Sequence, residues 1–220
     1  MKVILILLCA VLVSLFLRKE SQEQYVPAVI LKGLASLCFV VLGIICNPGN
    51  QVSNLIVTGL VVGCVADVLL NLRMVFKEKG QLIFLVGILV FLTGHILYLA
   101  GVFPLCSYKV ACIVIGIILT ALLMIWIFKR ITAKMAFKIF GVVYIGAIVL
   151  LNCVAIGNLI SVQSPFNGMF SAGALLFLLS DIVLILNTFG SEYKQSMRNN
   201  NITMYYAGQL LIALSLQYLA

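Results

Sequence analysis

Two aspartates, Asp67 and Asp181, stand inside long apolar runs. Their surroundings are alike, Val65-Ala66-Asp67-Val68-Leu69-Leu70 and Leu179-Ser180-Asp181-Ile182-Val183-Leu184. The chain has no other aspartate, and its four glutamates all fall in polar connectors. A carboxylate costs roughly 2.5–3.5 kcal/mol at bilayer depth on insertion scales, so two carboxyls kept at such positions are the first candidates for a functional site.

Lys32 and Gln209 add two polar side chains at similar depths. At about 1.5 Å per helical residue, Lys32 and the two aspartates lie roughly 8–10 Å from the basic ends of their apolar runs, and Gln209 lies a similar distance into its own. The four residues therefore fall in one layer. A structural ion pair, or a lysine that extends to the interface, is the simpler alternative. Because one lysine neutralises only one carboxylate, the other aspartate is left to be protonated or functional.

Several aromatic and amide side chains share helical faces with this layer. Tyr205 lies four residues before Gln209 and Tyr206 three residues before it, so all three are expected to line one cavity. An interfacial aromatic belt would account for the tyrosines but not for the glutamine. Asn71 lies one turn from Asp67, where it is suited to hydrogen-bond the layer or to position water.

His95 is the single histidine, and it shares a face with Phe91 and Tyr98. Residue counting puts it roughly 21 Å from the inner end of its segment, about 10 Å further out than the aspartates. A structural and a catalytic role suit it about equally. Zinc sites use three or four His, Cys or carboxylate ligands, so with the histidine outside the layer we expect neither a metal ion nor a cofactor.

The composition indicates whether water or lipid surrounds this chain. Of its 220 residues, 64% are hydrophobic and only 9% are charged. A soluble domain carries about 25% charged residues, so lipid must cover most of this surface and a multi-pass membrane protein is expected. The net charge of +8 does not indicate nucleic-acid binding, because the basic residues lie in short connectors rather than on one face.

Eight apolar segments can be marked, and each should be a helix, because continuous apolar runs do not suit a barrel. We predict a single all-α membrane domain over residues 1–220, with helices at about 3–17, 26–46, 52–72, 81–101, 107–128, 136–157, 168–188 and 203–219.

The connectors alternate in charge. Eleven of the fourteen basic residues lie in the connectors after segments one, three, five and seven. The positive-inside rule then predicts a cell-membrane protein with these connectors in the cytoplasm and both termini outside. The likeness between the third and seventh segments also fits a weak four-plus-four parallel repeat. Gly59-x-x-x-Gly63 predicts a close helix contact there.

The residue order resembles the YhhN-like family of integral membrane proteins. The resemblance extends from the second to the eighth segment. Two positions depart from the expected pattern, Ala66 in place of Gly and Gly33 in place of Pro, and both are packing changes. The stretches that carry the resemblance are Lys32, Ala66-Asp67-Val68-Leu69-Leu70, Phe84-x-x-Gly87-x-x-x-Phe91-x-x-Gly94-His95-x-x-Tyr98, Gly173-Ala174-Leu175-Leu176-Phe177-x-x-Ser180-Asp181 and Tyr206-x-x-Gln209-x-Leu211-Ile212.

The characterised members of that family are lysoplasmalogenases, so the resemblance implies an eight-helix hydrolase that cleaves the vinyl ether of a lysophospholipid. The products would be a fatty aldehyde and glycerophosphoethanolamine or glycerophosphocholine. The two aspartates would supply the acid and the anion that this reaction needs, with the order between them open. Lys32, His95, Tyr98, Tyr205 and Gln209 would support them. The alternatives are a transporter or binding protein, proton-coupled or for a lipid or small molecule, that uses the same buried charges, and a structural membrane subunit.

Overall fold

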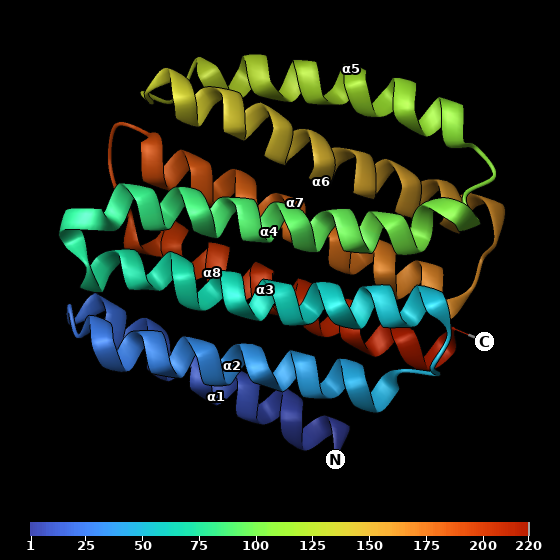
Figure 1. Cartoon of the computed structure of the whole chain (residues 1–220), viewed down its shortest axis with the longest axis horizontal. Helices are drawn as coiled ribbons and strands as arrows, with labels where there is room; N and C mark the ends of the chain where they lie inside the picture. Colours follow the sequence, from blue (N-terminus) through green and yellow to red (C-terminus); the bar gives the residue numbers. More distant parts are fainter. Residues whose placement is uncertain (220) are drawn as a thin grey trace.

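Backbone hydrogen bonds in lipid must be satisfied within each segment, and long helices do this throughout the chain. The computed structural model describes residues 1–219, and within them it contains eight α-helices and no strand (Figure 1). The all-α prediction is therefore confirmed. The helices are α1 (Lys2–Ser21), α2 (Tyr25–Cys46), α3 (Gln51–Val75), α4 (Gly80–Val102), α5 (Lys109–Phe128), α6 (Met135–Ser161), α7 (Pro165–Phe189) and α8 (Gln195–Ser215), with 3-10 turns η1 (Lys77–Lys79), η2 (Phe103–Leu105) and η3 (Leu216–Tyr218).

Six of the described helices, α2 to α7, are long and apolar enough to cross a membrane. The two end helices differ, and both are longer than their predicted apolar segments. The last turn of α1 carries Arg18, Lys19 and Glu20, and α8 begins eight residues before its apolar run, with a polar first half that includes Asn199-Asn200-Asn201. Eight helices were predicted correctly, and eight membrane crossings stay a prediction.

Six helices close into a ring in which α2, α3, α4, α6, α7 and α8 each pack on the next, and α8 packs back on α2. The remaining two lie outside it, α1 mainly against α2 and α5 against α6 (Figure 1). Each packed pair among α1 to α4 has a counterpart four helices later. Asp67 on α3 and Asp181 on α7 therefore hold matching places in the ring. The sequence repeat itself stays a prediction.

Glycines allow the closest of these helix contacts, as Gly59-x-x-x-Gly63 predicted. A Cβ atom added at Gly59 would lie 3.1 Å from the backbone oxygen of Gly94 on α4. On the other side of the ring, Cβ atoms added at Gly173 and Gly208 would each lie 2.7 Å from the other residue's backbone oxygen. The backbones of α3 and α4, and of α7 and α8, therefore touch directly, which holds the two aspartate-bearing helices firmly in place.

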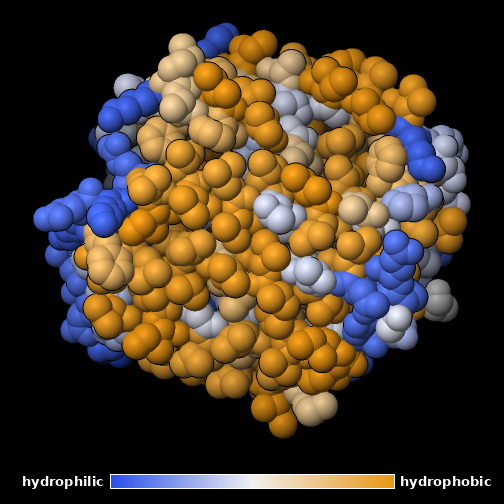
Figure 2. All heavy atoms as spheres, in the orientation of Figure 1, coloured by the Kyte–Doolittle hydropathy of each residue, from blue (hydrophilic) through white to orange (hydrophobic). Residues whose placement is uncertain are grey.

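The connectors after α1, α3, α5 and α7 meet at one end of the bundle, here called the basic end, and the chain termini lie at the other (Figure 1). Figure 2 shows a broad apolar band between two polar ends. Many bulky apolar side chains on the helices are exposed, among them Ile117 at 65% and Leu122 at 60% on α5. These features are those of a multi-pass membrane protein. Which end faces the cytoplasm stays a prediction.

Candidate functional site

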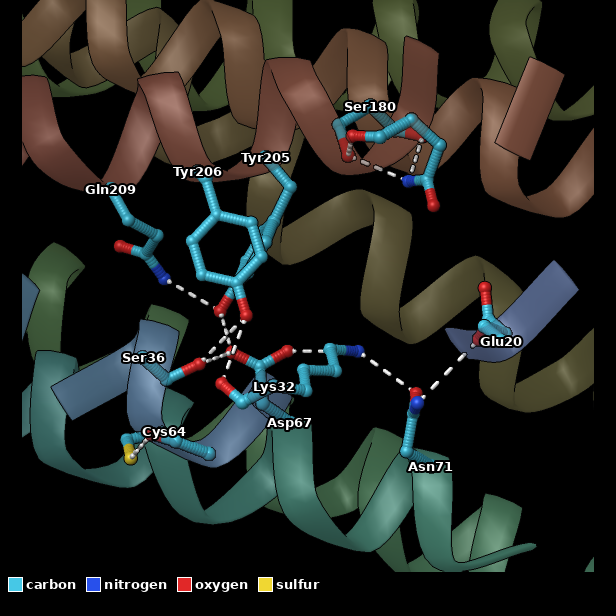
Figure 3. Close-up of polar contacts among 12 residues, drawn as sticks. Glu20, Lys32, Ser36, Cys64, Asp67, Asn71, Ser180, Tyr205, Tyr206 and Gln209 are labelled. Atoms are coloured by element: carbon cyan, nitrogen blue, oxygen red, sulfur yellow. Dashed lines mark hydrogen bonds and ion pairs between the residues drawn. The ribbon is translucent and has the colours of Figure 1, made fainter. Parts of the chain in front are cut away.

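Asp67 is 1% exposed and is held by three donors. The Lys32 ammonium lies 3.1 Å from Oδ1, while the hydroxyls of Ser36 and Tyr205 each donate to Oδ2 at 2.6 Å (Figure 3). Lys32 and Ser36 are four residues apart on α2, so they share the face that meets α3. The three donors therefore reach both oxygens of the carboxyl.

A directed chain of hydrogen bonds supports this arrangement from the side of α4 and α8. Tyr98 donates to Oε1 of Gln209 at 2.8 Å, and Nε2 of Gln209 donates to the Tyr205 hydroxyl at 3.4 Å. The Tyr205 proton is thus free to point at Asp67. Tyr206 lies 3.0 Å from the Ser36 hydroxyl and donates to the Lys32 carbonyl at 3.1 Å. The bonds from Tyr98 through Gln209 to Tyr205 are thus directed toward the carboxylate, whereas Tyr206 holds the backbone of α2.

Asp181 has a much poorer polar environment. It is 4% exposed, and the Tyr144 hydroxyl on α6 donates to its Oδ2 at 2.6 Å. Oδ1 makes no hydrogen bond within residues 1–219, and no cation there pairs with this carboxyl. The two aspartates therefore occupy matching places in the ring but have unlike partners.

Both aspartates line one pocket, here called the carboxyl pocket, with a volume of about 1050 Å³ that includes the space at its mouth. Lys32, Asn71 and Tyr205 also line it. The rest of its wall is largely apolar and comes from α3 to α8, so the polar groups converge at one side of a space suited to a hydrocarbon chain. The apolar wall includes Phe84, Ile88, Phe91, Ile127, Phe137 and Ile185.

A polar chain links the carboxyl pocket to the basic end. Lys32 donates to Asn71 at 3.2 Å, and Asn71 donates to Glu20 at 3.5 Å (Figure 3). Glu20 in turn accepts two hydrogen bonds from Arg198, at 2.8 and 2.9 Å. Burial raises the pKa of the Glu20 carboxyl, but the hydrogen bonds and charge of Arg198 outweigh it and hold the pKa below the ordinary value of 4.5. Arg198 also contacts Asn201, whose amide bonds Ser180, the neighbour of Asp181.

A second space, here called the vestibule, adjoins the carboxyl pocket at the basic end. Its volume is about 960 Å³, again counting the open mouth, and its lining is more polar. The two spaces share six lining residues, Asn71, Arg73, Leu184, Thr188, Arg198 and Asn201, and therefore adjoin each other between the basic end and the aspartates.

His95 lies behind the carboxyl pocket rather than in its wall. Its ring centroid is 5.6 Å from that of Tyr144 and 4.5 Å from that of Phe177. Neither ring nitrogen has a hydrogen-bond partner within residues 1–219. The histidine is thus one side chain removed from Asp181, because Tyr144 lies between them. Within the same residues, no group of three or more His, Cys, Asp or Glu side chains is arranged to hold a metal ion.

The sequence and the structure select overlapping residues. Of the nine candidates, Lys32, Asp67, Asn71, Asp181 and Tyr205 line the carboxyl pocket, while His95, Tyr98, Tyr206 and Gln209 stand behind it.

Two further residues, Ser36 and Tyr144, were missed by sequence reasoning. The spacing of Ser36 from Lys32 could have revealed it, because residues four apart share a helical face. Nothing in the apolar stretch around Tyr144 marks that tyrosine.

The fold and the site together define a class: an all-helical membrane protein with two buried carboxyls in one largely apolar pocket. The model of the YhhN family matches residues 27–216, which is most of the chain. The chain belongs to the YhhN family, as the resemblance predicted. No curated protein and no solved structure matches it.

Proposed function

We propose that this protein is a membrane hydrolase that cleaves the vinyl ether bond of lysoplasmalogens. The observation that carries the proposal is the pair of carboxyls in one pocket with unlike partners. Asp67 meets three donors, whereas Asp181 meets one. Vinyl ether hydrolysis needs one protonated and one ionised carboxyl together, and environments that separate two carboxyls in this way assign the roles.

Asp181 is the general acid in this proposal. With a single hydroxyl donor and no cation, its carboxyl is held in surroundings that disfavour charge. The acid gives its proton to the β-carbon of the vinyl ether, and the double-bond electrons form the new C–H bond. The α-carbon is left as an oxocarbenium ion, whose positive charge needs an anion nearby.

Asp67 is the anion. Lys32, Ser36 and Tyr205 keep it ionised, so it stabilises the cation without taking a proton. Water then adds to the α-carbon and gives a proton back to Asp181, which restores the acid. Transfer of the hemiacetal hydroxyl proton to the ether oxygen breaks the C–O bond, so the aldehyde leaves with the alkyl chain and the glycerol oxygen keeps the proton.

The apolar wall of the carboxyl pocket suits the alkenyl chain. Phe84, Phe91 and Ile185 from α4 and α7 contribute to it, and burying a hydrocarbon chain there contributes about 0.8 kcal/mol per CH₂. The glycerol end then points toward the vestibule. We infer that the substrate enters from the leaflet at the basic end, and that this end faces the cytoplasm.

The test is aldehyde release from lysoplasmenylethanolamine by the purified protein in detergent. Asp67→Asn and Asp181→Asn should each lower kcat at least about 100-fold, which is the usual contribution of a positioned acid or base. Glu192→Gln, which changes an exposed carboxyl in the connector before α8, is the control and should retain full turnover. Turnover in either aspartate variant at the rate of this control would refute the mechanism. Transport in sealed vesicles without aldehyde release would favour a transporter.

A further inference from the structure

Arg73 lies where the carboxyl pocket meets the vestibule. It belongs to the last turn of α3, and it lines both spaces. Its guanidinium carbon lies 4.3 Å from the centre of the Phe84 ring, which fixes the side chain against α4. Six residues separate it from Asp67, a rise of about 9 Å along the helix.

The charge of Arg73 is not matched by a carboxylate. Among residues 1–219, the ion pairs are those of Lys32 with Asp67, Lys194 with Glu192, and Arg198 with Glu20. Three other cations line these spaces beside Arg73. Lys32 and Arg198 are neutralised by their pairs, and the unpaired Lys138 lines the carboxyl pocket alone. Among residues 1–219, Arg73 is therefore the cation without an ion pair that lines both spaces. A half-buried arginine without an anion is suited to receive one from a ligand.

The order of the two spaces indicates the kind of anion. The carboxyl pocket is largely apolar, and the vestibule beyond Arg73 is more polar, with Glu20, Asn187, Tyr193 and Gln195 in its lining. A molecule with a hydrocarbon chain at one end and a phosphate at the other matches this order. A short glycerol arm between chain and phosphate would bridge the distance from the aspartates to the guanidinium.

We propose that Arg73 binds the phosphate of a single-chain phospholipid whose chain lies in the carboxyl pocket and whose head group lies in the vestibule. The proposal rests on the proposed function for the orientation of the chain. The guanidinium presents two N–H groups to two phosphate oxygens, a geometry that a lysine would not reproduce. Arg73 is therefore a specificity residue, which distinguishes phospholipids from neutral ether lipids.

Binding to the full-length protein in detergent tests this without requiring catalysis. Titration calorimetry compares three probes: a 1-alkyl lysophosphocholine, whose saturated ether is not cleaved, a 1-alkylglycerol without phosphate, and inorganic phosphate. Arg73→Met removes the charge and keeps an apolar stem on Phe84. The matched control is Arg130→Met, because Arg130 also stacks on an aromatic ring, that of Trp126 at 4.1 Å, but lines neither space.

The wild-type protein should bind the lysophosphocholine at least about tenfold more tightly than the alkylglycerol, since a charged hydrogen bond is worth that factor or more. Arg73→Met should lose this preference and bind the alkylglycerol as before, and Arg130→Met should match the wild type.

Three results would overturn the proposal: an unchanged preference in Arg73→Met, an equal loss for both lipids, or inorganic phosphate that binds as tightly as the lysolipid. The first and second would make Arg73 a structural residue, and the third would make the site one for free phosphate. Failure of aldehyde release refutes the proposed function alone, because the preference for phosphate is measured with a lipid that is not cleaved.

Discussion

Replacing Lys32 should lower the free energy of unfolding, and replacing Asp67 as well should restore part of it. In Lys32→Met the side chain keeps its length, but Asp67 loses its cation. Both residues are almost fully buried, at 4% and 1% exposed, so no solvent replaces the lost charge. Loss of one partner from a buried pair leaves an uncompensated ion, which is the costly case.

The size of the effect follows from the geometry. At 3.1 Å and an effective dielectric constant of about 20, the attraction between the two charges is about 5 kcal/mol. Asp67 retains the hydroxyls of Ser36 and Tyr205, which compensate part of this. We therefore expect Lys32→Met to lower the free energy of unfolding by about 3 kcal/mol, at the low end of the range for broken buried pairs.

The double variant Lys32→Met/Asp67→Asn should recover at least half of that loss, because no buried charge is left without a partner. Thermal and SDS-induced unfolding in detergent, followed by circular dichroism, measures the four members of the cycle. Aldehyde release should be absent in all three variants, since none keeps an ionised Asp67 with its cation. Lys134→Met, at an exposed lysine, is the control and should match the wild type in both assays.

Two outcomes would refute this reasoning. If Lys32→Met unfolds within about 0.5 kcal/mol of the wild type, the pair does not hold the site together. If the losses of the single variants simply add in the double variant, the two charges do not interact.

Three further perturbations test other contacts. Tyr144→Phe removes the donor to the second aspartate and should lower kcat about tenfold with little change in KM, measured by aldehyde release. Gly173→Ala places a methyl group 2.7 Å from a backbone oxygen of α8 and should destabilise the protein by about 1–3 kcal/mol in thermal unfolding, whereas Gly168→Ala, with no atom within 4 Å, should not. Glu20→Gln should weaken the attachment of α1 to α8, and the loss should be larger at pH 7 than at pH 3.

The sign of the last prediction follows from the Glu20 pKa. Because Arg198 holds that pKa below 4.5 in the folded protein, the stability from this pair is complete above pH 4.5 and is lost as the pH falls through the lowered value. The variant lacks this contribution, so its unfolding curve should depend less on pH in that range. Equal pH dependence in both proteins, measured by thermal unfolding, would contradict the assignment. For Tyr144→Phe, an unchanged kcat would exclude a positioning role, and for the glycine pair, equal stability would exclude direct backbone contact.

Much of the site could be predicted from residue type and depth, because buried charge in an apolar chain is expensive and therefore informative. Asp67, Asp181 and Lys32 were found in this way, and the structure brings all three to the carboxyl pocket. Counting residues from the helix ends gave the depth of each side chain in the membrane but not the helix that it faces. It put His95 far from the layer, whereas the ring lies against Tyr144, because depth along one helix says nothing about how neighbouring helices turn toward each other.

The sequence did not show which helices pack against each other. Nothing in the chain told which aspartate would meet Lys32, since one lysine suits either. That choice depends on α2 packing beside α3 and not beside α7, which is a property of the closed ring. The polar first half of α8 was also missed, because the search followed apolar runs. Arg198 and Asn201, which bond each other, belong to that half.

The ring has a consequence for how the site can change. Asp67 takes its partners from α2 and α8, and Asp181 takes its partner from α6. No helix supplies a hydrogen-bonding side chain to both carboxyls within residues 1–219. A substitution of Tyr144 on α6 therefore removes a hydrogen bond from Asp181 alone, and a substitution of Ser36 on α2 removes one from Asp67 alone. The hydrogen-bond partners of the two carboxyls can therefore change one at a time, so variation in this fold can alter the surroundings of one carboxyl while the hydrogen bonds of the other persist.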